Sequence, residues 1–132
     1  MRYLLDSDTS IDWLNGMRYA GPLLRALSAE GTERLGISLA TYGELLAGIP
    51  HSRDPHAAER SVRRFLRVVE VLPITRAVMQ RFARLKADLA HRGQLIGDFD
   101  TLIAATALHH RLTLVTRNVR HFGRIAELSL HH

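Results

Sequence analysis

Along the chain, short continuous apolar runs alternate with stretches whose apolar residues recur at helical spacing. Apolar runs bounded by polar or turn-forming residues predict buried strands. They occur at residues 3–5, 35–39, 69–72 and 112–115, with 125–130 as a candidate last strand. Strands and helices that alternate over short connections are typical of a parallel sheet covered by helices on both faces. The pattern therefore predicts an α/β fold.

Helical spacing, capping residues and glycines indicate where the helices lie. Helices are expected at residues 11–14, 23–27 and 41–47, from Asp54–Pro55 onward, from Thr75 to a stop at Gly93, and at residues 98–109. In open parallel sheets, sites form at the carboxyl ends of strands. Asp6 follows the first expected strand and Asn118 follows the fourth, so both are placed at such ends.

Composition limits the classes of protein to which the chain can belong. The chain has 132 residues, 46% of them hydrophobic, so we expect one domain over residues 1–132. It contains no cysteine, which excludes disulfides, thiolate zinc sites and cysteine nucleophiles. The opening residues lack the apolar core of a signal peptide, and no run approaches the ~20 apolar residues of a membrane span. We therefore expect a soluble, cytoplasmic protein without a membrane partner.

The positive charge is carried almost wholly by arginine. The formal net charge is +5, and Lys86 is the only lysine. Because the planar guanidinium matches phosphate oxygens, this excess suits a nucleic-acid partner. A GC-rich genome would raise the arginine content equally well without any function, and composition alone does not locate the charge on one face.

Three carboxylates stand beside or inside segments that a fold would bury. Asp6 ends the apolar opening, Glu44 interrupts an apolar helix, and Asp100 opens the apolar run of the last long helix. A buried charge is costly unless it is compensated, and a shared Mg²⁺ ion would compensate all three. Mg²⁺ often takes a phosphate as a further ligand, which on a basic chain favours phosphodiester chemistry. Asp6, Glu44 and Asp100 are therefore candidate metal ligands.

Each of these residues also has a plainer interpretation. Asp6 could cap the helix expected to begin near Ser10, although Asp8 and Thr9 are closer to that start. Glu44 could simply lie on a solvated helix face.

Two aspartates near the start of the last long helix are expected to have different roles. Asp98 and Asp100 are two residues apart in an expected helix, so at ~100° per residue their side chains point to nearly opposite faces. We assign Asp98 as the helix cap and Asp100 as the ligand.

Asn118 is either a turn residue or a contributor to the metal site through its carboxamide. The neighbouring Arg117 and Arg120 could hold substrate phosphate.

Four segments resemble, in order, the motifs of PIN-domain ribonucleases, and more narrowly those of the VapC toxins of bacterial toxin–antitoxin pairs. They are Leu4–Asp8, Thr41–Gly48, Ile96–Ala105 and Leu114–Phe122. The resemblance runs from Arg2 to the end of the chain and implies a three-layer α/β/α domain around a mainly parallel sheet. Asp6, Glu44 and Asp100 match the family's first three acidic positions, and Asn118 matches the fourth.

The resemblance also implies an activity and a partner. The activity is hydrolysis of RNA phosphodiester bonds by an endoribonuclease that depends on Mg²⁺ or Mn²⁺, with water as the nucleophile and products that carry a 5′-phosphate. The partner is a cognate VapB-like antitoxin, in a homodimer or a larger complex.

Two other classes stay open. Asp6–Ser10 after a strand also resembles the aspartyl-phosphate motif of haloacid-dehalogenase-type phosphatases, although Lys86 is expected within a helix rather than after a strand. The other class is a receiver-type or interaction module that binds without cutting.

Overall fold

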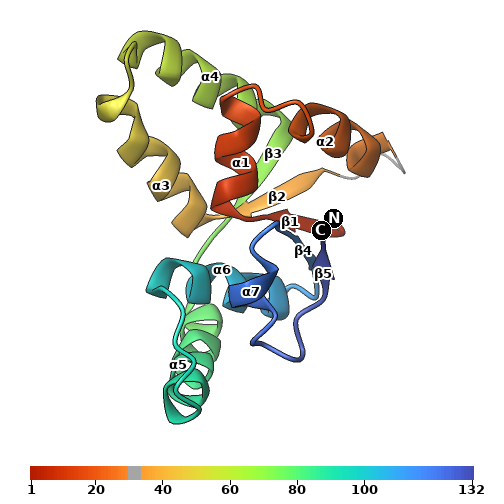
Figure 1. The fold of residues 1–132 in the computed structure, drawn as a ribbon, viewed down its shortest axis with the longest axis vertical. Helices are drawn as coiled ribbons and strands as arrows, with labels where there is room; N and C mark the ends of the chain where they lie inside the picture. The colour runs from red at the N-terminus through yellow and green to blue at the C-terminus, as the bar shows by residue number, and fades with distance from the viewer. Residues whose placement is uncertain (30–33) are drawn as a thin grey trace.

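The computed structural model describes residues 1–29 and 34–132, in which five short strands form one parallel sheet (Figure 1). The strands are β1 (Tyr3–Leu5), β2 (Leu35–Ser38), β3 (Val69–Leu72), β4 (Thr113–Val115) and β5 (Leu130–His131). Their order across the sheet is β3-β2-β1-β4-β5. Leu5 pairs with Ile37 on one side and with Val115 on the other, so β1 lies in the middle of the sheet.

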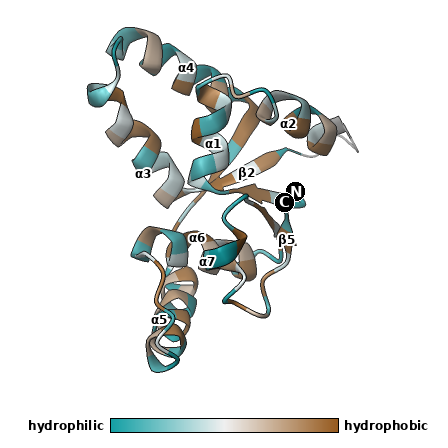
Figure 2. Cartoon of the chain, viewed as in Figure 1, coloured by the Kyte–Doolittle hydropathy of each residue, from teal (hydrophilic) through white to brown (hydrophobic). Residues whose placement is uncertain are grey.

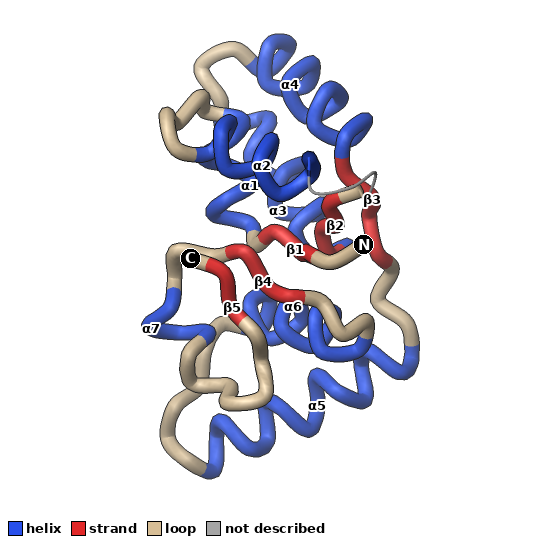
Figure 3. Tube along the Cα trace, turned by 90° about the vertical axis from the view of Figure 1, so that its right-hand side faces the viewer, coloured by secondary structure: helices blue, strands red, loops and turns tan. Residues whose placement is uncertain are grey.

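Helices connect the strands and cover both faces of the sheet. They are α1 (Ser7–Leu14), α2 (Ala20–Ala29), α3 (Leu39–Gly48), α4 (Pro55–Val68), α5 (Arg76–His91), α6 (Asp98–His109) and α7 (Val119–Phe122), with a 3₁₀ turn η1 (Ile49–His51) between α3 and α4. Figure 3 shows the strands between α1 to α4 on one side and α5 and α6 on the other. The predicted three-layer α/β/α fold is confirmed. In the described ranges, no helix is long and apolar enough to cross a membrane.

Two apolar cores lie on the two faces of the sheet. Successive side chains of a strand point to opposite faces, so the neighbours Leu4 and Leu5 enter different cores although neither is exposed to solvent. Leu4 packs with the core that contains Ile103 of α6, and Leu5 packs with the core that contains Phe65 of α4. Figure 2 shows the strands coloured mainly as hydrophobic. Burial on both faces explains why the strand segments are continuous apolar runs rather than alternating ones.

Side-chain caps fix where several helices begin. Ser38, Asp54 and Thr75 accept hydrogen bonds from backbone N–H groups in the first turns of α3, α4 and α5, at 3.1, 3.1 and 3.3 Å. Such caps satisfy N–H groups that have no partner within the helix. The predicted helix starts at Asp54–Pro55 and after Thr75 are confirmed.

The carboxyl-terminal segment differs from the expectation. Most of the candidate strand at residues 125–130 is a loop with a turn at residues 126–127, and only Leu130 of that range joins β5. Ile125 and Leu128 are buried, but they contact the core under α5 and α6 from a loop. Their apolar character therefore reflects packing rather than strand pairing. The short helix α7 was not predicted, because four residues are too few to show helical spacing.

Candidate active site

The candidate residues gather where β1 and β4 end, beside the first turns of α1 and α6. Asp6 follows β1, and Thr116 follows β4. Because β1 and β4 are parallel neighbours, their carboxyl ends meet at the same edge of the sheet. Asp100 reaches this edge from the first turn of α6, and Glu44 reaches it from α3.

Asp6 is a buried helix cap with two hydrogen-bonded oxygens. Its side chain is 2% exposed; Oδ1 accepts from the backbone N–H of Thr9 at 2.8 Å, and Oδ2 accepts from the Thr116 hydroxyl at 2.5 Å. Burial raises the pKa of Asp6, and the hydrogen bonds from Thr116 and Thr9 oppose that rise. The expected helix start near Ser10 was wrong, because α1 begins at Ser7. Asp6 itself is the cap, and Asp8 lies in the first turn.

Glu44 is half-buried and hydrogen-bonded to α1. Its Oε1 accepts from the Ser7 hydroxyl at 2.7 Å, and the Ser7 oxygen lies 3.0 Å from the hydroxyl oxygen of Thr41. Ser7 is the residue directly after Asp6. This contact attaches α3 to the start of α1 and turns the Glu44 carboxylate toward the edge of the sheet where Asp6 and Asp100 lie. Glu44 therefore does not lie on a fully solvated helix face.

Asp100 is the half-buried acid on which the other charges act. Burial raises the pKa of Asp100 most, and the negative charges of Glu44, Asp8 and Asp6 raise it further in that order. The positive charge of His121 acts in the opposite direction. The structure thus brings Glu44 and Asp6 near enough to Asp100 for their charges to act on it, and it adds Asp8 to the group. We call these four residues the acidic cluster.

Asp98 does not cap α6 as expected. The residue at the cap is Gly97, which makes no side-chain cap hydrogen bond, and Asp98 is the first residue of the helix. The exposed Asp98 carboxylate instead pairs with the Lys86 ammonium of α5 at 2.9 Å. A carboxylate one residue past the cap points outward here because a cation on the packed neighbouring helix attracts it. The predicted separation of Asp98 from Asp100 is consistent with their different partners.

Asn118 lies at the start of α7, beside the acidic cluster. Its backbone N–H donates to the Thr116 hydroxyl oxygen at 2.9 Å, and its side-chain Nδ2 lies 3.1 Å from Nδ1 of His121. The carboxamide is therefore turned toward the histidine, one helical turn further along. The Thr116 hydroxyl joins Asn118 to Asp6, since it accepts from one and donates to the other.

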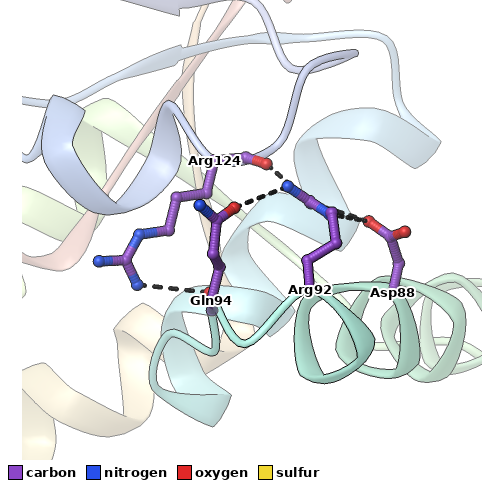
Figure 4. Close-up of polar contacts among 4 residues, drawn as sticks. All are labelled: Asp88, Arg92, Gln94 and Arg124. Carbon is purple, nitrogen blue, oxygen red and sulfur yellow. Dashed lines mark hydrogen bonds and ion pairs between the residues drawn. The ribbon is translucent and has the colours of Figure 1, made fainter.

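A polar network fastens the loop before α6 to the turn after α7 (Figure 4). The Arg92 guanidinium donates to Asp88 at 2.8 Å, to the Gln94 side chain at 2.8 Å and to the backbone carbonyl of Arg124 at 2.9 Å. The Arg124 guanidinium donates in return to the backbone carbonyls of Gln94 and Leu95 at 3.3 and 3.0 Å. These contacts hold the segment that leads to Asp100 against the segment that follows Asn118.

The acidic cluster fits a divalent cation in donor chemistry and in charge. Carboxylate and hydroxyl oxygens are hard donors of the kind Mg²⁺ prefers. A bound cation would also offset the negative charges that act on Asp100. Among residues 1–29 and 34–132, however, no three His, Asp or Glu side chains are arranged to hold a metal as they stand. Glu44 is turned onto Ser7, and Asp6 is held by Thr9 and Thr116. A shared ion would therefore require side-chain rotation, most simply of Glu44.

Sequence reasoning missed three members of this region. Thr116 and His121 were not singled out from the sequence, and Asp8 was considered only as a helix cap. A signal for His121 existed, because it lies three residues after Asn118 and so on the same face of a helical turn. No local pattern indicated the bond between Thr116 and Asp6, which are 110 residues apart.

Comparison with known proteins identifies the family. Residues 3–128 match the PIN domain family. Ribonuclease VapC1 of Methanocaldococcus jannaschii is 30% identical over 129 residues, covering 98% of this chain and 85% of that protein. The tRNA(fMet)-specific endonuclease VapC of Salmonella typhimurium is 30% identical over 125 residues, covering 95% and 92%. The crystal structure of VapBC2 from Rickettsia felis, bound to a DNA fragment from its promoter, matches with a TM-score of 0.90 at 27% identity, covering 99% and 98%. The chain belongs to the PIN-domain family, and within it to the VapC group.

Proposed function

We propose that this protein is a metal-dependent endoribonuclease and the toxin of a toxin–antitoxin pair. Cleavage of RNA is the activity named for its VapC relatives. The observation in this chain that carries the proposal is Asp100, a half-buried acid whose pKa is raised by burial and by the charges of Glu44, Asp8 and Asp6. Acids that repel one another in a partly desolvated site are suited to bind a cation.

In this proposal, Asp6, Glu44 and Asp100 hold Mg²⁺ or Mn²⁺, and Asn118 contributes from the start of α7. A divalent ion supplies charge stabilisation for the phosphate and a water activated for attack. The chain's own hydroxyls orient the carboxylates: Thr116 fixes Asp6, and Ser7 holds Glu44 toward the edge. No side chain forms a covalent bond with the substrate: in the proposed reaction water attacks the phosphorus and the 3′ oxygen leaves, so the products carry a 5′-phosphate and a 3′-hydroxyl.

The proposed protein partner is a VapB-like antitoxin. The matched Rickettsia felis and Salmonella typhimurium structures are VapBC complexes. In this chain, a cavity of about 480 Å³ between α1, α3 and α4 opens beside Glu44 and has apolar walls that include Ile11 and Leu14. We propose that an amphipathic antitoxin segment lies on apolar surface around α3, where Leu45 lines this cavity and Leu46 is 42% exposed, and that it brings a cationic side chain to Asp6 and Asp100.

Cleavage of RNA by the purified protein tests the activity. We expect cleavage with Mg²⁺ or Mn²⁺, no cleavage in EDTA, and 5′-phosphate ends on the products. Full activity after rigorous metal removal would contradict the metal dependence. A radioactive phosphate trapped on the protein as an adduct that is both acid-stable and base-labile, as an aspartyl-phosphate is, would instead support the phosphatase or receiver class.

Two further expectations belong to the same proposal. A small open reading frame immediately upstream, encoding a DNA-binding antitoxin, would distinguish a toxin from a housekeeping nuclease. Location in the cytoplasm and assembly as a homodimer or larger complex with the antitoxin stay predictions.

A further inference from the structure

A second cavity lies beside the acidic cluster, where β4 and β5 end. Its volume is about 360 Å³, and it is lined by Thr9, Tyr19, Leu23, Val115, Thr116, Arg117, His131 and His132. Val115 belongs to the core on the face that α1, α2 and α4 cover. Tyr19 and Leu23, at the start of α2, form a wall over the ends of the two strands. We call this space the flanking cavity.

The flanking cavity and the acidic cluster share a wall. Thr9 and Thr116 both line the cavity, and both donate hydrogen bonds to the Asp6 carboxylate, one to each oxygen. Asp6 therefore lies immediately behind the side chains that a molecule in the cavity would touch. A polymer with a phosphate at the acidic cluster has its next unit within reach of the cavity.

The two sites differ in charge. The eight lining residues, all in the described part of the chain, include Arg117, His131 and His132 and no acidic side chain. The acidic cluster next to them carries four carboxylates. A substrate that alternates anionic groups with uncharged rings can satisfy both sites at once, because the metal and Arg117 would take successive phosphates.

Arg117 packs on the ring of Tyr19 and also makes a side-chain hydrogen bond with it. Its guanidinium carbon lies 4.5 Å from the centroid of the Tyr19 ring, and the Tyr19 hydroxyl donates to Asp12. Burial and the contact with Asp12 raise the pKa of Tyr19 to about 12, so the phenol stays a neutral donor. A guanidinium on an aromatic face uses its planar side for that contact, and with five N–H donors it keeps donors beyond the one on Tyr19 that can bind a phosphate. Arg117 is exposed and so is accessible to one.

We propose that the flanking cavity holds one unpaired nucleotide next to the scissile phosphate of the RNA. The edge of the Arg117 guanidinium binds the phosphate of that nucleotide, and its base enters against Leu23 and Val115. Unpaired bases are bound in RNA-binding proteins by contact with apolar, aromatic and arginine side chains. The cavity then sets which base is accepted beside the cut. This inference rests on the proposed ribonuclease activity and adds a specificity site to it.

The first test removes the charge at the mouth of the cavity. The probe is single-stranded RNA that the wild type cuts, and the variant is Arg117→Gln, an exposed position whose change should leave the fold intact. We expect KM to rise about tenfold with kcat within about twofold, since the contact is equal in ground and transition states. RNA binding in EDTA should weaken, and the slope of log Kd against log salt should fall by about 0.7, the value for one phosphate contact to a single strand.

The control is Arg84→Gln, which removes the same charge from an exposed arginine on α5, on the other side of the sheet. Binding, KM and salt slope should match the wild type. Equal changes at Arg84 and Arg117 would overturn the proposal, because the effect would then follow net charge rather than the cavity. Unchanged KM and binding at Arg117 would overturn it as well.

A second test changes the shape of the cavity. Leu23→Phe narrows it, and the probe is a pool of single-stranded RNA with random positions whose cleavage products are sequenced. We expect the base distribution at one position beside the cut to shift by about fivefold, with purines reduced. An unchanged distribution in a folded variant would contradict the inference. If the wild type cuts no RNA at all, the proposed function fails instead, so the two failures are distinguishable.

Discussion

The two acids at the start of α6 lie two residues apart and yet have opposite surroundings. Asp98 is exposed and pairs with Lys86 at 2.9 Å, whereas Asp100 is half-buried beside Glu44, Asp8 and Asp6. An exposed ion pair contributes little to stability because water and salt screen it. Like charges in a partly buried site repel strongly, and a cation can offset that repulsion. The surroundings, rather than the residue type, thus separate a surface carboxylate from a candidate ligand.

The largest expected effect comes from neutralising each acid in turn. Asp100→Asn should lower RNA cleavage by at least about 100-fold, because it removes a proposed ligand of the ion that stabilises the reacting phosphate. Asp98→Asn removes only a surface ion pair and should change kcat/KM by less than about threefold. Cleavage assays on both purified variants, with circular dichroism to confirm folding, measure this contrast. Equal losses in two folded variants would show that the division between Asp98 and Asp100 is wrong.

A smaller effect is expected on the antitoxin. If a cationic antitoxin side chain pairs with the acidic cluster, Asp100→Asn should weaken the complex by about tenfold and lessen its salt dependence. Asp98→Asn is the matched control, since it removes the same charge from the exposed side of the same helix. Calorimetry at two salt concentrations measures both variants. Unchanged affinity of Asp100→Asn at both concentrations would mean that inhibition works from outside the cluster.

A still smaller effect concerns the stability of the metal-free protein. The pKa of Asp100 is raised in the folded chain, so the folded state binds this proton more readily than the unfolded state, and stability falls as pH rises through the raised pKa. In EDTA at pH 7, Asp100→Asn should therefore raise the melting temperature by roughly 4 °C, or about 1 kcal/mol. The gain should shrink as the pH is lowered, because Asp100 of the wild type becomes protonated. A variant less stable than the wild type at pH 7 would argue against repulsion.

The smallest effect is expected at the surface pair. Lys86→Ala should change the free energy of unfolding by less than about 1 kcal/mol, since the ammonium and the Asp98 carboxylate are both exposed. Cleavage should stay at the wild-type rate. Denaturant unfolding and a cleavage assay measure the two quantities, and a large loss of activity would indicate that Asp98 and its partner orient Asp100 after all.

The fold was largely predictable because strands that are buried on both faces of the sheet consist of consecutive apolar residues, and such runs can be recognised in the sequence. Four of the five strands lie at the predicted residues, with boundaries within one residue. The segment at 125–130 failed because apolar residues that anchor a loop in the core give the same local signal as a strand. Periodicity cannot separate the two.

The candidate site was predictable only in part. Helical periodicity placed Asp98 and Asp100 in different surroundings, as the structure shows, although the cap role given to Asp98 was wrong and the ligand role of Asp100 stays a prediction. Acids next to apolar runs indicated Asp6 and Glu44. The partners that give these acids their properties come from distant segments, as the Thr116 hydroxyl on Asp6 and the Lys86 ammonium on Asp98 show. Such contacts depend on how strands and helices are placed in space, which a single sequence does not encode locally.

Direct measurement of metal binding tests the central claim that the acidic cluster, and not the exposed acid beside it, holds the ion. Mn²⁺ and Mg²⁺ should be titrated by calorimetry into the metal-free wild type, Asp100→Asn and Asp98→Asn, without RNA. The account predicts binding to the wild type, an affinity within about twofold of it for Asp98→Asn, and a loss of at least about tenfold for Asp100→Asn. Equal affinities for the two variants, or no binding to the wild type, would contradict it.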